Sequence, residues 1–139
     1  MISNARRALI TLLLACVALA AGEALAKVGL ESLSKKQQQE VWKSTSNIAR
    51  IDAILAACNT NTNLERRIVA AVRDCVKPRS LNSIRSYWRK QKAKYAKELG
   101  QLDCDNEFMQ KEIKRAVRDF NKLVRDVRDQ CRRCIFPIC

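Results

Sequence analysis

Histidine is absent from this sequence of 139 residues, and its absence excludes several kinds of catalytic site. A chain without histidine cannot build Ser-His-Asp or Cys-His nucleophilic systems, histidine-based metal centres, or a haem attached through Cys-x-x-Cys-His. A pair of carboxylates is still formally able to catalyse hydrolysis. Most acidic residues of this chain, however, lie among basic residues at salt-bridging distance. We therefore predict that the protein is not an enzyme and carries no cofactor.

A small acidic cluster, Asp103, Asp105 and Glu107, stands apart from this pattern. Clustered carboxylates are compatible with calcium binding, but this cluster lies at the start of a predicted helix. Negative charge near a helix N-terminus is favourable because it complements the helix dipole. We interpret the cluster in this second way and predict no metal site.

Glycine and proline are also scarce, at three and two residues. So few breakers argue against a loop-rich disulfide knot and favour long regular elements. Beyond residue 26, no apolar stretch approaches the roughly 20 residues that a membrane-spanning helix needs. We therefore expect no membrane span in the processed chain.

The N-terminus has the features of a secretory signal peptide. A positive start at Arg6-Arg7 precedes an apolar run over residues 8–21. The tripeptide Ala24-Leu25-Ala26 then provides the small-x-small pattern that a signal peptidase accepts. We predict a cleaved signal peptide at 1–26 and a single domain at 27–139, placed in the periplasm or cell exterior of a bacterial source.

An alternative is an envelope lipoprotein. The tetrapeptide Leu13-Leu14-Ala15-Cys16 has the form of a lipobox, in which the cysteine becomes lipidated. Against this, residues 17–20 remain apolar where lipoproteins usually turn polar. A cysteine within an apolar stretch often acts only as a small hydrophobic residue. Lipidation at Cys16 is therefore kept as the less favoured reading.

Cleavage after Ala26 removes Cys16 and leaves an even number of cysteines. An even count in an exported chain is typical of a disulfide framework. The remaining cysteines are Cys58, Cys75, Cys104, Cys131, Cys134 and Cys139.

The spacing of apolar residues predicts four helices and no strand. Their expected ranges are 34–57, 63–77, 81–99 and 104–132. The last helix has the most regular apolar stripe, which is typical of a helical bundle. Its members are Met109, Ile113, Ala116, Phe120, Leu123 and Val127.

Residues that start and stop helices support these ranges. Ser34 with Gln37, and Thr62 with Glu65, have the spacing of capping boxes. Pro78 is expected to end the second helix. Gly100 suits the C-terminal end of the third.

Short connections favour an antiparallel up-down bundle, and this arrangement restricts the disulfides. Two cysteines pair only when their Cα atoms lie within about 7 Å. The bundle puts Cys58 and Cys104 at one end, and Cys75 with Cys131 and Cys134 at the other. We therefore predict an all-α, small antiparallel four-helix bundle stapled by three disulfides. The favoured set is Cys58–Cys104, Cys75–Cys131 and Cys134–Cys139, and a set with Cys75–Cys134 and Cys131–Cys139 is nearly as good.

Cys131 and Cys134 have the Cys-x-x-Cys spacing of thiol–disulfide exchange proteins. The two intervening arginines would lower a thiolate pKa and so favour reactivity. This motif ends a predicted helix, however, where the helix dipole opposes a thiolate. A structural role is favoured, and exchange through Cys131 and Cys134 is an alternative.

The charge of the chain is strongly positive. Removing the signal peptide lowers the formal net charge from +13 to +12. Such a field favours an anionic partner, for example a membrane surface, an acidic glycan or an acidic protein. Nucleic acid is not expected as a partner of an exported protein.

The third predicted helix has the densest positive charge. Residues 85–97 contain no acid, so we expect a strong local positive potential. Basic residues among aromatic ones suit anionic surfaces, although the aromatics also fit a core and the charges a solvated face. The candidate binding residues are Arg85, Arg89, Lys90, Lys92, Lys94, Lys97, Tyr87 and Trp88.

Together these observations predict an exported, non-catalytic binding protein with a basic helical face for an anionic partner. A secreted inhibitor or toxin-like antagonist, whose basic surface blocks an acidic target, is an alternative. If the third helix proves to be only a solvated face, the next candidate surface is the first helix around Trp42.

Overall fold

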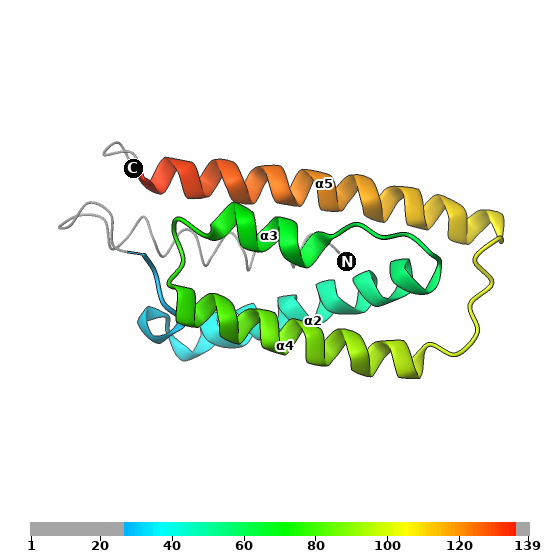
Figure 1. The fold of residues 1–139 in the computed structure, drawn as a ribbon, viewed down its shortest axis with the longest axis horizontal. Coiled ribbons are helices and arrows are strands. Elements are labelled where there is room, and N and C mark those ends of the chain that lie inside the picture. Colours follow the sequence, from blue (N-terminus) through cyan, green and yellow to red (C-terminus); the bar gives the residue numbers. More distant parts are fainter. Residues whose placement is uncertain (1–26, 136–139) are drawn as a thin grey trace.

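The computed structural model describes residues 27–135, with side chains as far as Arg132. The predicted signal peptide, Cys16, and the side chains of Cys134 and Cys139 lie outside this described part. Within it the protein is all-helical, as predicted, and no helix is both long and apolar enough to cross a membrane. The elements are a 3-10 turn η1 (Leu30–Ser32) and helices α2 (Lys35–Ala57), α3 (Leu64–Val72), α4 (Pro78–Glu98) and α5 (Glu107–Ile135), shown in Figure 1.

Consecutive helices of the bundle run in opposite directions, as predicted (Figure 1). The most extensive packing, however, joins helices that are not consecutive. α2 packs mainly on α4, and α3 packs mainly on α5, with a smaller contact between α3 and α4. Each of these two main pairs is parallel, because one intervening helix reverses the chain direction twice. The bundle therefore consists of two parallel helix pairs laid against each other.

The segment between α3 and α4 differs from the prediction. The second helix was expected to continue to Lys77, but α3 ends at Val72. Beyond it the backbone pairs with the N-terminal segment, because Val28 N–H donates to the Cys75 carbonyl and Lys77 N–H donates to the Val28 carbonyl. These bonds use backbone groups that a longer helix would need. Pro78 consequently begins α4 instead of ending α3, at a position where its missing N–H costs nothing.

The predicted helix caps have mixed outcomes. The Ser34–Gln37 capping box is confirmed, with both reciprocal hydrogen bonds present. The Thr62–Glu65 box is wrong. Asn63 precedes α3 in a left-handed conformation (φ 49°), and its N–H donates to Asn61 Oδ1. This turn leaves Thr62 Oγ1 buried without a hydrogen-bond partner among the described residues.

The core lies between the two helix pairs and confirms the apolar stripe of the last helix. Phe120, Leu123 and Val127 are almost fully buried, and Ile113 is buried near the other end of the stripe. The aromatic ring of Trp88 enters the same core from α4, where it is 3 % exposed. The remaining large core side chains come from the other helices and the N-terminal segment, and they include Val28, Leu33, Val41, Ile48, Leu55, Leu64, Ile68, Val72, Val76 and Leu81.

Two disulfides join the ends of the bundle as the favoured assignment predicted. The Cα atoms of Cys58 and Cys104 are 5.5 Å apart, and those of Cys75 and Cys131 are 5.7 Å apart. The alternative set, with Cys75 bonded to Cys134, is therefore wrong. The bridges span 46 and 56 residues, and constraining the unfolded chain in this way is worth on the order of 4 kcal/mol for each bridge.

This pairing bears on the exchange hypothesis. Cys131 is bonded to Cys75 and is 2 % exposed, so its sulfur is neither a free thiol nor accessible to a substrate disulfide. Exchange chemistry requires an accessible thiolate. In the described structure Cys131 is therefore a partner in a buried disulfide.

The short α3 leaves part of the bundle uncovered. Its nine residues rise about 13 Å, whereas the 29 residues of α5 rise about 43 Å. Beside the N-terminal half of α5, a groove of about 640 Å³ opens between α5 and α2. Phe108 lies at this groove and is 72 % exposed. The apolar lining includes Ile51, Ile54, Leu55, Met109, Ile113 and Ala116.

The burial of the two disulfides predicts the order in which they are reduced. Cys75 and Cys131 are buried, whereas Cys58 and Cys104 are partly exposed. Limited dithiothreitol followed by alkylation and peptide mapping should therefore label Cys58 and Cys104 first. In guanidinium, where burial no longer protects either bridge, the two should be reduced at similar rates. Earlier labelling of Cys75 in the folded protein would contradict this arrangement.

Candidate functional site

The predicted binding residues of α4 do not form one surface. Trp88 points into the core, and its Nε1–H donates to Asp52 Oδ2 of α2 at 3.2 Å. Lys92 Nζ lies 2.8 Å from the same oxygen. Asp52 is 5 % exposed, so these two contacts compensate a buried carboxylate. Trp88 and Lys92 therefore join α4 to α2.

Arg85 and Arg89 converge on one acid of α3, Glu65. Arg85 Nε lies 3.1 Å from Glu65 Oε1, and Arg89 Nη2 lies 2.9 Å from it. Partial burial by itself would raise the pKa of Glu65, but hydrogen bonds from Arg89 and Arg85 outweigh burial and lower the pKa. The strong positive potential expected over residues 85–97 is therefore reduced at Arg85, Arg89 and Lys92, because acids from other helices pair with them.

The remaining basic residues of α4 lie along one outward stripe. Lys94 makes a long contact of 3.9 Å with the exposed Glu98, and its Nζ lies 6.0 Å from the centroid of the Tyr95 ring. Lys90 and Lys97 make no ion pair or side-chain hydrogen bond with any other described residue, and Arg79 extends the stripe toward the start of α4 by helical spacing. We call Arg79, Lys90, Lys94 and Lys97 the α4 cationic stripe.

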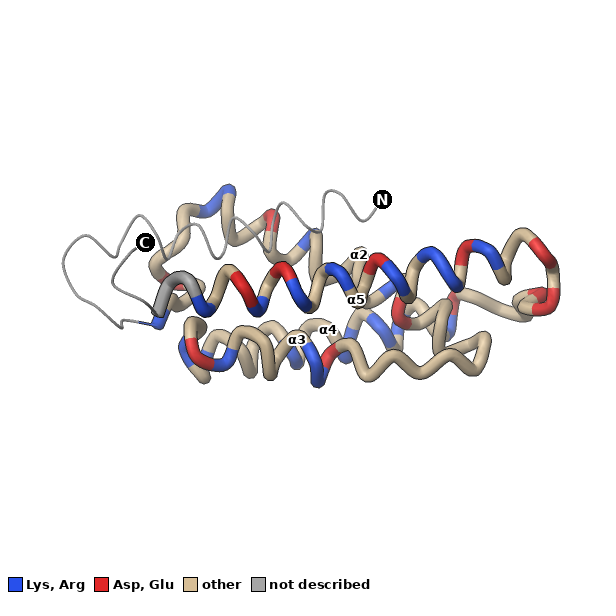
Figure 2. Tube along the Cα trace, turned by 90° about the horizontal axis from the view of Figure 1, so that it is seen from above, with Lys and Arg blue, Asp and Glu red and all other residues tan. Residues whose placement is uncertain are grey.

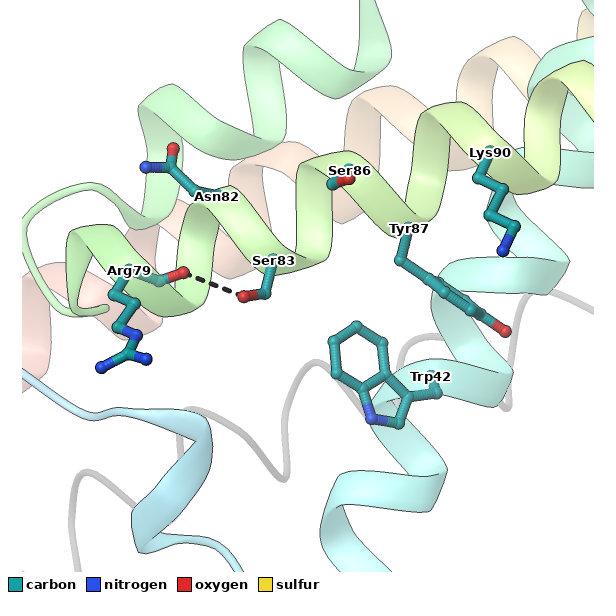
Figure 3. Close-up of a pocket in the computed structure, with 7 residues that line it drawn as sticks. All are labelled: Trp42, Arg79, Asn82, Ser83, Ser86, Tyr87 and Lys90. Carbon is teal, nitrogen blue, oxygen red and sulfur yellow. Dashed lines mark hydrogen bonds between the residues drawn. The ribbon is translucent and has the colours of Figure 1, made fainter.

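A cleft lies beside this stripe, between α4 and α2. Trp42 of α2 and Tyr87 of α4 face each other there, with ring centroids 5.0 Å apart and planes tilted by 58° (Figure 3). The volume of this cleft is about 770 Å³. We call it the Trp42–Tyr87 cleft, and its lining residues are Trp42, Arg79, Asn82, Ser83, Ser86, Tyr87 and Lys90.

Contacts further along the parallel helix pair position this cleft. The hydroxyl groups of Ser46 and Tyr95 are 3.0 Å apart, and the guanidinium of Arg50 lies 5.9 Å from the Tyr95 ring. Ser46 Oγ also donates to Gln91 Oε1 at 3.3 Å. Together with the Asp52 contacts, these interactions set how far α2 is shifted along α4. That register places Trp42 opposite Tyr87.

The charged residues that line the cleft are all positive. None of its lining residues is acidic. The positive charge of Arg79 acts on one acid near the cleft, Glu31. A hydrogen bond from Lys77 is the main cause of the lowered Glu31 pKa, and the charge of Arg79 adds a smaller contribution. Glu31 itself is ion-paired with Lys77. At the other end of the cleft, Lys90 makes no ion pair with a described residue.

The outer face of α5 has a different charge pattern. Basic and acidic positions alternate along it (Figure 2). Lys111 pairs with Glu107 at 2.7 Å, and Arg115 approaches Glu112 at 3.9 Å. Glu107 lies in the first turn of α5. This position agrees with the interpretation that its negative charge complements the helix dipole. Among the described residues, no group of three histidine, cysteine or acidic side chains is placed to hold a metal ion.

Of the residues that line the cleft on α4, Tyr87 and Lys90 are among the candidates named from the sequence. Four others are not among those candidates: Arg79, Asn82, Ser83 and Ser86. The first helix around Trp42 had been considered only as a separate surface, whereas the structure joins it to α4. Comparison with known protein families, curated proteins and solved structures finds no match to this chain.

The buried Asp52 carboxylate should be important for stability. Asp52→Ala leaves the Trp88 N–H without its acceptor and Lys92 without its acid, so we expect the free energy of unfolding to fall by about 2 kcal/mol. Asp52→Asn retains an acceptor for Trp88 and should lose less. Urea denaturation measures both variants. A loss below about 0.5 kcal/mol for Asp52→Ala, the range of an ordinary surface substitution, would show that this contact is dispensable.

The lowered pKa of Glu65 predicts a pH-dependent contribution to stability. Because the folded pKa is below the unfolded one, the stabilisation is present above the unfolded pKa and is lost as pH falls through the folded pKa. Glu65→Gln should therefore destabilise the protein by a few tenths to about 1 kcal/mol at pH 7. The two proteins should converge once the pH falls below the lowered folded pKa of Glu65.

Urea denaturation at pH 7, 5 and 3 tests this expectation. Glu40→Gln is the matched control, because Glu40 makes no ion pair with a described residue. A difference between wild type and Glu65→Gln that stays constant from pH 7 to pH 3 would contradict the proposed role of the Arg85–Glu65–Arg89 contacts.

Proposed function

We propose that this protein is an exported, non-catalytic binding protein that engages an anionic partner through the α4 cationic stripe and the adjoining Trp42–Tyr87 cleft. The observation that carries the proposal is the composition of the cleft. Two aromatic rings are flanked by Arg79 and Lys90, and no acid lines the cleft. Aromatic faces beside cations that make no ion pair with a described residue suit recognition of a negatively charged group.

The charge of the whole domain supports this proposal. Residues 27–139 have a formal net charge of +12. A field of this sign attracts anionic partners and accelerates their encounter. Three members of the α4 cationic stripe make no ion pair with a described residue, and Lys94 makes only a long one with Glu98. The outer face of α5, in contrast, has paired charges of both signs.

The disulfides support export and a role in binding. Structural disulfides persist in oxidising compartments, such as a periplasm or the cell exterior. Both bridges fix the ends of helices, and a rigid surface loses little entropy when a partner binds. A secreted inhibitor would use the same basic surface, and its anionic partner would be an acidic protein.

A pair of charge variants tests the proposal. Replacing Lys90, Lys94 and Lys97 together by Gln removes three charges from the stripe and maintains helix propensity. The control replaces Lys114, Lys122 and Arg128 of α5 by Gln, and it therefore lowers the net charge by the same amount as the stripe variant. The stripe variant should bind anionic probes at least about tenfold more weakly than the control, because local charges dominate within a Debye length of about 10 Å.

Interferometry on phosphatidylglycerol vesicles, polyglutamate and polygalacturonate provides the measurement, at 50 and 300 mM salt. Phosphatidylcholine vesicles serve as the uncharged reference. We expect binding to at least one anionic probe, which weakens as salt rises and depends on the stripe. Equal losses in the stripe and control variants would show that only net charge matters, and the proposed site would then be wrong.

A further inference from the structure

We infer that the Trp42–Tyr87 cleft is a saccharide site that accepts a short sugar chain with at least two anionic groups, such as an oligouronate. This inference rests on the proposed function, since it names the ligand class of the same surface. It is carried by four features of the cleft: the partly exposed aromatic pair, the hydroxyl groups beside it, the separation of its two cations, and its lack of acids.

The aromatic pair supplies the apolar part of such a site. Trp42 and Tyr87 are partly exposed and come from different helices. Their tilt of 58° means that the two rings do not stack flat on each other, so ring surface remains open to the cleft (Figure 3). A sugar ring has a face of C–H groups, and such faces pack on the electron-rich faces of aromatic rings.

Hydroxyl groups next to the rings supply polar contacts. Ser83 Oγ donates to the Arg79 carbonyl at 3.1 Å, which leaves the oxygen lone pairs of Ser83 available to accept. Ser86 and the Tyr87 hydroxyl make no hydrogen bond with another described side chain, and each is able to donate and accept. Sugars need both kinds of partner because each sugar hydroxyl is itself a donor and an acceptor.

The position of the cations gives the ligand its length. Arg79 and Lys90 lie at opposite ends of the row of lining residues (Figure 3). They are 11 positions apart on α4, which corresponds to about 16 Å along the helix axis. Two cations so far apart do not converge on a single phosphate or carboxylate. They match an extended ligand that has separate anionic groups along its length.

Other anionic partners fit these features less well. A peripheral membrane helix inserts exposed apolar side chains into the lipid interface, but the exposed large apolar residue of the described chain is Phe108, which lies at the groove between α2 and α5. Trp42 and Tyr87 are each only partly exposed, so they offer less apolar surface to a bilayer than Phe108 does. An acidic peptide would satisfy the cations but would not require ring faces.

Calorimetry on the oxidised, exported protein tests the inference with tetragalacturonate as the probe. Its methyl ester retains the sugar rings without charge, and tetraglutamate has the same number of side-chain carboxylates without rings. We expect tetragalacturonate to bind at least about tenfold more tightly than either control, because each of them lacks one of the two required contacts.

Variants of the cleft separate these contacts. Arg79→Gln with Lys90→Gln should weaken tetragalacturonate binding at least about tenfold. Lys114→Gln with Lys122→Gln removes the same charge from α5, outside the cleft and the stripe, and should cost less than about fivefold, the scale of screened surface charges. Trp42→Ala should abolish most binding, and Trp42→Phe should recover it because an aromatic face is restored. Circular dichroism checks that each variant is folded.

The outcomes distinguish this inference from the proposed function. Equal affinity for tetraglutamate, or unchanged binding by a folded Trp42→Ala variant, would overturn the saccharide site. Stripe-dependent binding of vesicles or polyglutamate without any uronate binding would also overturn it, while leaving the proposed function intact. Failure of every anionic probe would overturn both.

Discussion

The Asp52 carboxylate is the polar contact on which the pairing of α2 with α4 depends. A buried charge is tolerated only where hydrogen bonds and an opposite charge compensate it, and Trp88 and Lys92 of α4 provide both. Sliding α2 by one turn, about 5.4 Å, would take Asp52 away from these partners. The energetic cost of an uncompensated carboxylate therefore fixes the register of the two helices. The candidate cleft is a consequence of that register, because Trp42 reaches Tyr87 only in this alignment.

The two disulfides constrain which ends of the helices lie together. Cys75–Cys131 links the end of α3 to the last turns of α5, so it secures one parallel pair. Cys58–Cys104 links the end of α2 to the connection before α5, so it holds the two pairs together. With these ends fixed, the cleft is built on helices whose relative positions are constrained. Side chains on such elements are held in place before a ligand arrives, which reduces the ordering that binding requires.

Features that depend on local spacing could be predicted from the sequence. The apolar stripe of α5 and the Ser34–Gln37 cap follow from helical periodicity, and the matching of Cys58 with Cys104 follows from which helix ends meet. The Thr62–Glu65 cap failed because Asn63 enters α3 from a left-handed turn, which a pattern of residue types does not reveal. The end of α3 was misplaced because Val28, far away in the sequence, takes its backbone partners.

The site was harder to predict for a related reason. Charge within residues 85–97 appears unbalanced only while α4 is considered alone, since Glu65 and Asp52 approach from α3 and α2. The sequence shows the helical spacing of four lining residues, Arg79, Ser83, Ser86 and Lys90. Nothing in the sequence, however, indicates that these residues lie beside Trp42. The opposition of Trp42 and Tyr87 depends on a tertiary register, and periodicity within a helix does not contain that information.

The parallel pairing of α2 with α4 also has a consequence for how the chain reaches this structure. A helical hairpin forms from neighbours in the sequence, but the largest helix interface here joins segments separated by all of α3. Its contacts span about 45 residues, as between Trp42 and Tyr87. Closing so long a loop costs entropy before any packing is gained. Helix formation alone thus gives this chain little of its tertiary structure, because its largest helix interface forms only after that loop has closed.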